Sequence, residues 1–418
     1  ADGVFSEKPG CNQWHSKGVY QIPFRTLYSK NVKNLYLAGR VISATHVAFG
    51  STRVMATGAH EGQAVGMAVV LGKQKGWEPA HLASKENINA LQQALLKTGQ
   101  HIPGIKRNEN PVYKSVIKAS STLELKSLPA DGPWYLLDFS VAQMLPAKPG
   151  KFPAISFKYA ALDHTTMEVE FRISSKSFNH TPDVILEKQT VELSKGDGEF
   201  TVKFSAEVKE EQYAFICLLK NDKVKIKTSE TRITGILTVY NRFNKAVSNY
   251  GKQEPVEDIG VEAFEFWVPM RRPEGQNLAF TLSEPLKTFE ATNLKSGYQR
   301  PVSSTNAWTA ALDDQNPVLI LNFDAPKTVS NITLFLDADY DHPAESTLMG
   351  HPEDVMPFVV RNYKIKDNKG NLLAEVKGNY QSVNKIYIGK ALNLNGITIE
   401  FEKPVPHVPV AVFEIDVD

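Results

Sequence analysis

Three glycines spaced four residues apart, Gly58, Gly62 and Gly66, are the residues whose type and spacing most directly suggest a binding surface. Glycine costs a helix interior about 1 kcal/mol relative to alanine, so three on one side of a helix predicted over residues 58–71 indicate a packing or a binding role. A flat ligand or another backbone could approach that side closely. The start of the helix, over residues 51–57, would offer free N–H groups to an anion or a polarised carbonyl. Spacing alone leaves ligand binding and tight helix packing open.

A second cluster has the residue types of a calcium site. Asp337, Asp339 and Asp341 stand at alternate positions, as at the opening of a calcium-binding loop. An EF-hand needs glycine at its sixth position and glutamate at its twelfth, where this chain has His342 and Leu348. The spacing therefore excludes an EF-hand and leaves two alternatives, a calcium site of another type or a solvated strand end.

The elements that would position the glycines follow from the local pattern. Residues 34–38 form a short apolar run that ends at Gly39, as a buried parallel strand would, and a loop then leads to the glycine-bearing helix. A further helix is predicted over residues 84–98, because Ser84 suits an N-cap and Gly99 a helix stop.

Residues 18–98 resemble the C-terminal segment of the FAD-dependent oxidoreductase family that has the glutathione-reductase-type FAD fold. The likeness rests on residues 20–27, 34–43, 51–55 and 62–66. It implies FAD in the parent protein, with these residues as flavin contacts: Gly39, Arg40, Gly58, Gly62 and Gln63.

The same resemblance implies two catalytic or substrate-binding side chains, His46 and Arg53. An imidazole titrates near neutrality, so His46 could shuttle a proton. A guanidinium suits planar anions, so Arg53 could hold a carboxylate or stabilise the reduced flavin. A hydrogen-bonded loop histidine and a structural arginine remain the alternatives.

The opening half of a dinucleotide-binding domain is not found in this sequence. Such a domain begins with a strand, a G-x-G-x-x-G turn and a helix. The nearest string, at Gly196 and Gly198, lacks the third glycine and lies between two alternating runs, which predicts a hairpin turn. We therefore expect this chain alone not to hold FAD, and we expect the missing N-terminal FAD-binding half to be its partner.

Beyond residue 112 the pattern changes to short runs in which polar and apolar residues alternate. One block extends to about residue 290, and a second follows a junction rich in proline and glycine. The predicted fold is mainly β: two antiparallel, jelly-roll-like β-sandwich domains preceded by a small α-rich remnant of an α/β FAD-binding domain. The expected domains are residues 1–107, 108–290 and 291–418.

The last block resembles the discoidin, or factor 5/8 type C, galactose-binding-like superfamily. A tryptophan loop at Trp308 precedes alternating strands, and the chain ends on the strand-like run 411–417. The resemblance implies loops that bind sugars, for which Trp308, Tyr340, His342 and His351 are candidates. Other aromatic candidates are Trp134, Trp267 and Tyr298. A core or rim position is the alternative for each aromatic ring.

Charge and composition exclude some classes of binding partner. The formal charge is +1, from 47 basic and 46 acidic residues, and no basic run occurs, which argues against nucleic acid. No apolar stretch is long enough for a membrane span, and residues 1–6 do not resemble a signal peptide. The sandwich domains favour a periplasmic or secreted parent protein. Cys11 and Cys217 are expected to be free thiols.

The sequence thus predicts the C-terminal portion of an FAD-dependent oxidoreductase, whose β-sandwich domains serve assembly or bind a small-molecule or carbohydrate substrate. The parent protein would be an enzyme, and this portion alone would be inactive. Two alternatives are kept: a non-catalytic carbohydrate-binding protein, and a polysaccharide-degrading enzyme such as a lyase.

Overall fold

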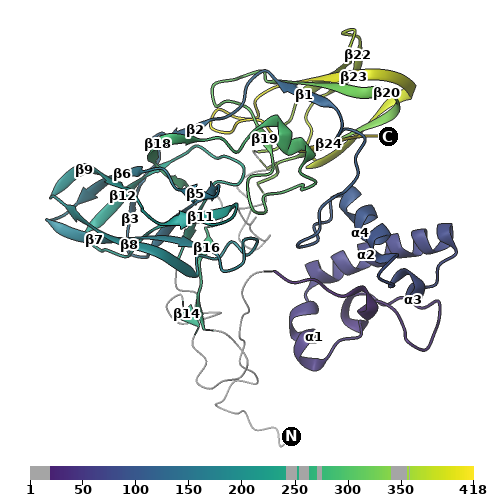
Figure 1. Ribbon diagram of the computed structural model, residues 1–418, viewed down its shortest axis with the longest axis horizontal. Coiled ribbons are helices and arrows are strands. Elements are labelled where there is room, and N and C mark those ends of the chain that lie inside the picture. Colours follow the sequence, from purple (N-terminus) through teal and green to yellow (C-terminus); the bar gives the residue numbers. More distant parts are fainter. Residues whose placement is uncertain (1–18, 242–251, 254–262, 271–274, 340–354, 357) are drawn as a thin grey trace, which may run out of the picture.

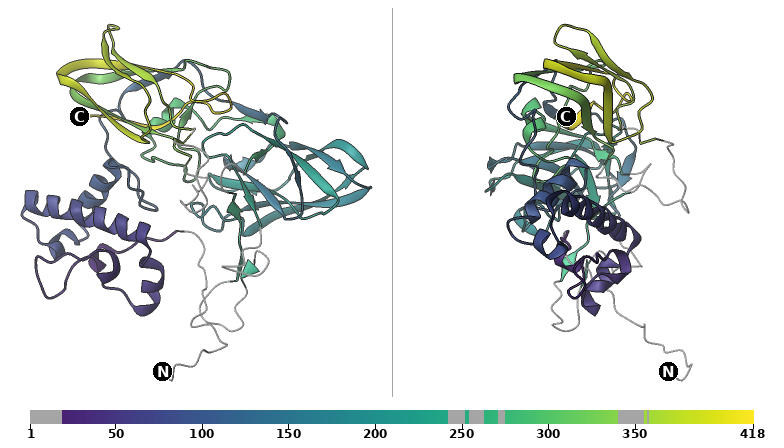
Figure 2. Two further views of the ribbon diagram at one scale, coloured as in Figure 1. Left: turned by 180° about the vertical axis from the view of Figure 1, so that it is seen from behind. Right: turned by 90° about the vertical axis from the view of Figure 1, so that its right-hand side faces the viewer.

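A computed structural model describes residues 19–241, 252–253, 263–270, 275–339, 355–356 and 358–418 (Figure 1). The chain forms an α-rich unit, a middle β-sandwich and a C-terminal β-sandwich. Seen from behind and from the side, the α-rich unit lies beside the two sandwiches and not between them (Figure 2).

The α-rich unit is held together mainly by helix packing. Its helices are η1 (Phe24–Thr26), η2 (Gly39–Val41), α1 (His46–Thr52), α2 (Met55–Lys75), α3 (Pro79–Leu82) and α4 (Ile88–Lys97). Ala64 and Ala68 of α2 and Leu91 and Leu95 of α4 belong to one small core, in which short side chains let the helices approach closely. Gly76, with a φ of 68°, ends α2 in the left-handed conformation.

The strand predicted over residues 34–38 does not form. Tyr36 makes an isolated antiparallel bridge to Tyr28, and the neighbouring residues are irregular. A strand is stabilised by its neighbours in a sheet, and the described residues supply no parallel partner for this one. The helix predicted from Ser84 begins later, at Ile88, while the Ser84 hydroxyl accepts a hydrogen bond from the Asn87 N–H in the turn before it.

The middle sandwich consists of two antiparallel sheets that enclose one core. The first sheet has the order β16 (Val268–Pro269), β13 (Leu237–Tyr240), β4 (Val141–Ala147), β11 (Gln212–Leu218), β7 (Thr165–Ile173) and β8 (Val184–Leu193). The second has the order β17 (Asn277–Leu278), β12 (Val224–Ser229), β6 (Ile155–Ala161), β18 (Phe280–Leu286) and β2 (Leu125–Leu128), with β3 (Trp134–Leu136) on β12 and β9 (Gly196–Val202) on β6. Two short pairs complete it, β5 (Gly150–Lys151) with β10 (Glu207–Val208) and β14 (Lys252–Gln253) with β15 (Phe264–Glu265).

Aromatic side chains fill the space between these sheets. Phe171 stacks on Phe204 with ring centroids 4.8 Å apart, and both rings are fully buried. Cys217 is a buried free thiol, as predicted, and burial raises its pKa. Cys11 lies outside the described residues.

The hairpin turn predicted at Gly196 is wrong. The strand before it, β8, pairs with β7, whereas the strand after it, β9, pairs with β6 of the other sheet. The Gly196–Gly198 string therefore begins a strand after a crossover between sheets. Gly198 is constrained by packing, because a Cβ there would lie 2.6 Å from the Tyr159 hydroxyl.

The C-terminal sandwich is one seven-stranded antiparallel sheet that curls around its own core. Its order is β19 (Trp308–Thr309), β24 (Ala411–Val417), β20 (Val318–Leu336), β23 (Val383–Phe401), β21 (Tyr363–Asp367) and β22 (Leu372–Val376), with η3 (Ala291–Lys295) nearby. The register of β20 on β23 shifts at two places, which allows both long strands to bend.

The seventh strand, β1 (Val116–Ala119), comes from far earlier in the chain. It pairs with the first part of β20, from Val116 opposite Asn322 to Ala119 opposite Leu319. Residues 116–119 therefore belong to the C-terminal sheet and not to the middle domain in which we expected them.

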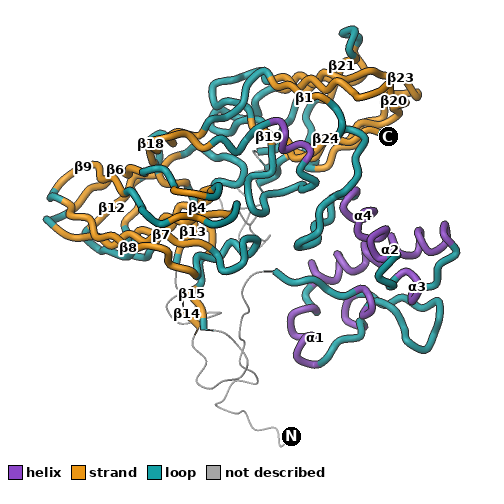
Figure 3. The backbone as a smooth tube through the Cα atoms, viewed as in Figure 1, coloured by secondary structure: helices purple, strands orange, loops and turns teal. Residues whose placement is uncertain are grey.

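The predicted fold class is confirmed. Strands dominate, the sheets are antiparallel, and helices are confined mainly to the N-terminal unit (Figure 3).

Candidate functional site

The site implied by the glycine pattern is built around the turn at Gly39. Ala38 is extended, and Gly39 follows with a φ of 69°, a conformation that glycine adopts without strain. The Gly39 N–H donates a 2.6 Å hydrogen bond to Oε2 of Glu61, which lies on α2 and is only 3% exposed. Gly58 lies one helical turn earlier, where an added Cβ would come within 3.5 Å of the Gly39 Cα. Position 58 thus lies against η2, at a distance at which a Cβ would make an ordinary contact.

Two buried polar atoms of the α-rich unit have no hydrogen-bond partner among the described residues. They are Oε1 of Glu61 and the hydroxyl of Thr52, the last residue of α1. Burial raises the pKa of Glu61, and the Gly39 N–H opposes that rise. A buried acceptor without a partner costs about 1–3 kcal/mol, so a partner for Glu61 Oε1 would stabilise this turn.

The remaining glycines of α2 face open space. Gly62 and Gly66 are exposed, and a Cβ on either would meet no described atom within 4 Å. Gly58 thus lies in contact with η2, whereas the described residues provide no packing partner for Gly62 and Gly66. Large apolar side chains are exposed nearby, with Val47 at 87% and Met55 at 93% of their possible surface.

The predicted catalytic residues lie on the same segment. His46 begins α1, just after Thr45, whose hydroxyl accepts from the Ala48 N–H, and Arg53 follows the end of α1. Both side chains and that of Arg40 are exposed, and none makes a hydrogen bond or ion pair within the described part of the chain. The structure places them on one stretch of surface without joining His46 to Arg53.

Gln63 has a different partner from the one predicted. Its side-chain amide donates to the Thr98 hydroxyl at 3.0 Å and so ties α2 to the end of α4. Its role as a flavin contact stays a prediction.

These residues fit one wall of a flavin site. They supply a positive-φ glycine turn, a helix surface free of side chains and an orphaned buried carboxylate oxygen. Among the described residues there is no strand, glycine turn and helix that could hold a pyrophosphate, so the opposite wall would have to come from another segment.

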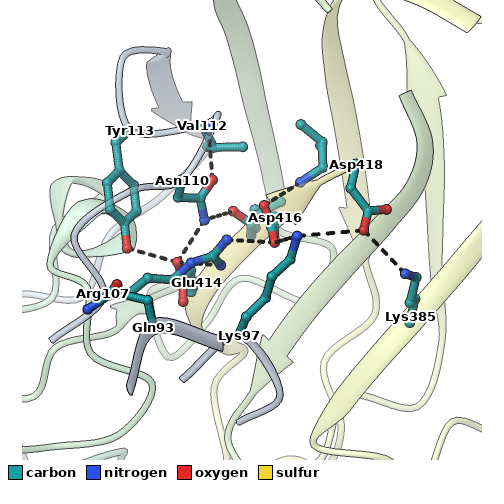
Figure 4. Close-up of polar contacts among 12 residues, drawn as sticks. Gln93, Lys97, Arg107, Asn110, Val112, Tyr113, Lys385, Glu414, Asp416 and Asp418 are labelled. Carbon is teal, nitrogen blue, oxygen red and sulfur yellow. Dashed lines mark hydrogen bonds and ion pairs between the residues drawn. The ribbon is translucent and has the colours of Figure 1, made fainter. Parts of the chain in front are cut away.

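A second polar cluster was not foreseen from the sequence (Figure 4). Arg107 reaches Glu414 Oε1 at 3.1 Å and Asp416 Oδ2 at 2.8 Å, and all three side chains are nearly fully buried. The same Oε1 accepts from Asn110 at 2.7 Å and from the Tyr113 hydroxyl at 2.8 Å. The signal that could have found it is the pair of acidic residues inside the otherwise apolar run 411–417.

This cluster fixes the chain between α4 and β1 to the last strand of the protein. Burial and the nearby Glu414 carboxylate raise the pKa of Tyr113, so its hydroxyl stays a hydrogen-bond donor. Gly297 belongs to the same junction, because its carbonyl accepts from the Arg107 N–H and a Cβ on it would lie 2.3 Å from the Arg107 carbonyl oxygen. These contacts are structural, since every group is satisfied within the protein.

The sugar candidates of the C-terminal sandwich do not form a platform in the described structure. Trp308 is fully buried, and its indole N–H donates to the Ser121 carbonyl, so the ring has no exposed face for a sugar. Tyr340, His342 and His351 lie outside the described residues.

The carboxylates proposed for calcium are only partly described. Asp337 is buried, and it accepts hydrogen bonds from the Thr234 hydroxyl and the Asp339 N–H, while Asp341 lies outside the described residues. In the described ranges no group of three or more His, Cys, Asp or Glu side chains could hold a metal ion. The calcium site stays a prediction.

Among the residues that the structure describes, none of the helices combines the length and the hydrophobicity that a bilayer span requires.

Comparison with known proteins agrees with the N-terminal resemblance. Residues 2–95 match the family model described as FAD dependent oxidoreductase. No curated protein matches the chain.

Several solved carbohydrate-binding modules resemble part of the chain. The family 32 module of Streptococcus pneumoniae EndoD is 14% identical, with 33% of this chain and 90% of the module covered and a TM-score of 0.25. The family 32 module of Clostridium perfringens NanJ, solved with galactose, is 16% identical, with coverages of 32% and 86% and a TM-score of 0.24. Chitosan-binding module 1 of a chitosanase/glucanase from Paenibacillus sp. IK-5 is 16% identical, with coverages of 32% and 87% and a TM-score of 0.23.

Proposed function

We propose that the α-rich unit is the C-terminal part of an FAD site in an oxidoreductase, and that the β-sandwiches capture or orient its substrate. The observation that carries the first part is the Gly39 turn on α2, with the orphaned Glu61 oxygen beside it and the open glycines next along the helix. The match of residues 2–95 to FAD dependent oxidoreductases supports the same assignment.

The residues of this wall would have different roles in binding the cofactor. Gly39, Gly58 and Gly62 lack side chains and would let the cofactor approach the backbone, while Arg40 would lie beside its charged groups. Glu61 Oε1 would accept a hydrogen bond from a donor on the cofactor or on the missing wall. FAD, when bound, supplies the capacity to accept a hydride or electrons from a substrate.

His46 and Arg53 would act on the substrate side of this wall. The His46 imidazole could take the proton that leaves the substrate when it is oxidised. The Arg53 guanidinium could hold a substrate carboxylate or balance negative charge. Both side chains are exposed on the wall, as they must be to meet a substrate that approaches from outside it.

The exposed apolar residues around the turn indicate where the missing wall would pack. Val41, Val47 and Met55 are 67%, 87% and 93% exposed, and they lie on the elements that also carry the flavin candidates. A protein–protein interface would bury such exposed apolar side chains. A dinucleotide-binding half would cover it.

The FAD proposal is tested by adding a dinucleotide-binding half to this chain. A dinucleotide-binding segment with a G-x-G-x-x-G turn, taken from an FAD dependent oxidoreductase of the matching family, is co-expressed with this chain, and copurified flavin is measured by visible absorbance. We expect stoichiometric FAD in the complex and none in the chain alone. A folded complex without FAD would overturn the proposal and favour a non-catalytic binding protein.

A matched pair of variants locates the cofactor. Gly62→Val puts a branched side chain on the open face of α2 and should abolish flavin binding. Gln74→Val makes a similar change at an exposed position near the end of the same helix and should not. Equal flavin content in the two variants would show that the glycine face is not the flavin wall.

A further inference from the structure

A cavity of about 270 Å³ opens beside β3 at one edge of the middle sandwich. The lining residues used below are Trp134, Tyr135, Asp138, Phe139, Tyr240 and Gln276. Most of them are aromatic, and two carry polar side chains. We propose that this cavity binds the pyranose ring of an uncharged sugar, which gives the substrate-capture role proposed above a location and a ligand class.

Aromatic rings approach the cavity from both faces of β3. Trp134 is on the outer face and is 40% exposed, although a tryptophan this large is usually mostly buried. Tyr135 points to the opposite face and packs edge-on against Tyr240, with centroids 5.1 Å apart. A pyranose has flat faces of C–H groups that pack on such rings, and this apolar contact is what an exposed tryptophan at a cavity rim offers.

The polar groups of the cavity determine which sugar fits. Asp138 is exposed, and its carboxylate makes no hydrogen bond or ion pair within the described part of the chain. It is the one charged side chain among the described lining residues. A carboxylate accepts hydrogen bonds from two neighbouring sugar hydroxyls and repels a uronic acid, while the Gln276 amide offers both a donor and an acceptor.

The rim is held in place before any ligand arrives. The Thr228 hydroxyl donates to the Pro133 carbonyl at 2.6 Å, and the Gly132 N–H donates to the Thr228 carbonyl at 3.0 Å. Lys227 lies opposite Trp134 on β12, with its ammonium 5.2 Å from the centre of the indole ring. Preorganised side chains lose less entropy on binding, which favours a site over an accidental hollow.

The volume fits one sugar ring and not a buried chain. It lies just below the roughly 300–1,000 Å³ typical of ligand pockets. The rest of an oligosaccharide would extend past Trp134 into solvent, so we expect modest affinity, with Kd values of roughly 1 μM to 1 mM.

The test measures sugar binding to the whole chain by calorimetry, without flavin. The probes are cellohexaose, maltohexaose and galactose, with hexagalacturonate as the charged comparison. We expect at least one neutral probe to bind and hexagalacturonate to bind more weakly. Trp134→Ala should weaken binding by roughly tenfold or more, and Asp138→Asn should weaken it by a smaller factor.

Leu136→Ala is the matched control, because Leu136 lies on the same face of the same strand, is 38% exposed and does not line the cavity. It should bind like the wild type. Circular dichroism melting confirms that all variants fold. The inference is overturned if no neutral probe binds, if Trp134→Ala binds as well as wild type, or if hexagalacturonate binds best. Because flavin is absent from this measurement, its failure is separate from failure of the flavin proposal.

Discussion

The α-rich unit and the middle sandwich differ in how completely they bury their apolar side chains. The buried core of the α-rich unit consists of aliphatic side chains such as Leu91 and Leu95, whereas that of the sandwich also contains stacked rings such as Phe171 and Phe204. The α-rich unit leaves Met55 almost fully exposed and leaves a buried carboxylate oxygen of Glu61 without a described partner. The sandwich closes around its own apolar residues on both sheets.

This difference separates a unit with a closed core from one that, under the proposed function, a second segment would cover. A closed core buries its own apolar side chains, so the sugar site that we propose lies at its rim, at Trp134. An incomplete core shows its function by what it leaves unsatisfied. Four predictions test this contrast, and the expected change in the free energy of unfolding becomes smaller from one to the next.

The largest effect is expected where the two kinds of region are joined. Arg107→Ala leaves the buried Glu414 and Asp416 carboxylates without their cation and should lower the free energy of unfolding by about 3–5 kcal/mol. Lys385→Ala removes an exposed partner of Asp418 and should cost less than about 1 kcal/mol. Urea unfolding measures both, and equal costs would show that the buried cluster does not hold the junction.

A pH effect is expected from His101, near the same junction. Burial, together with Arg300 and His180, lowers the pKa of His101 from 6.5 to about 4. The unfolded chain therefore binds the proton more readily, so the contribution of His101 to stability is complete above about pH 6.5 and is lost as the pH falls toward 4. The loss should be about 1–2 kcal/mol after solvent screening.

His101→Gln should flatten this part of the curve of unfolding free energy against pH. Urea unfolding at intervals between pH 4 and pH 7 gives that curve. An unchanged slope in the variant would assign the acid sensitivity to other groups.

Glu61 should give a smaller effect of opposite sign. Burial raises its pKa above 4.5, so the folded α-rich unit binds a proton that the unfolded chain has released, and stability falls as the pH rises from about 4.5 through the raised value. Glu61→Gln keeps an acceptor for the Gly39 N–H and should add about 1 kcal/mol at neutral pH. Hydrogen exchange of the α2 amides tests this, and we expect slower exchange in Glu61→Gln than in the wild type at neutral pH. If the variant exchanged more slowly than the wild type only at acidic pH, the prediction would be contradicted.

The smallest effect on stability is expected at Met55. Its side chain is 93% exposed, so Met55→Ser should change the free energy of unfolding by no more than about 0.5 kcal/mol. The same variant should reduce copurification of the dinucleotide-binding half, because it removes apolar surface from the proposed interface. A large loss of stability would mean that Met55 is already packed in the free chain.

The fold was predicted from local sequence patterns. Alternation over short runs indicated the two sandwiches, and the glycine and alanine spacing indicated α2, because both signals depend only on neighbouring residues. Pairing partners are not encoded locally. Nothing within Val116–Ala119 indicates that β1 joins β20, and the 34–38 run looked like a strand because its composition does not reveal whether a neighbouring strand exists.

The candidate sites were predicted less completely than the fold. Gly39 and Gly58 lie against each other, and Gly62 follows one turn further along α2, while their role as flavin contacts stays a prediction. Glu61 was missed because a charged residue in a helix is usually solvated, and only the structure shows it buried. Trp308 illustrates the reverse error, since a predicted loop residue lies on β19 with its side chain in the core of the C-terminal sandwich.

The pairing of β1 with β20 determines the order in which the protein can assemble during synthesis. The first strand of the C-terminal sheet leaves the ribosome before the whole middle sandwich, but its partners follow only after it. The middle sandwich can therefore fold as an inserted unit while β1 waits unpaired, and the C-terminal sheet, with its contacts so distant along the chain, should form last and slowly. Arg107 meets its carboxylates only when β24 joins this sheet, so the α-rich unit is anchored to the C-terminal sandwich late in assembly.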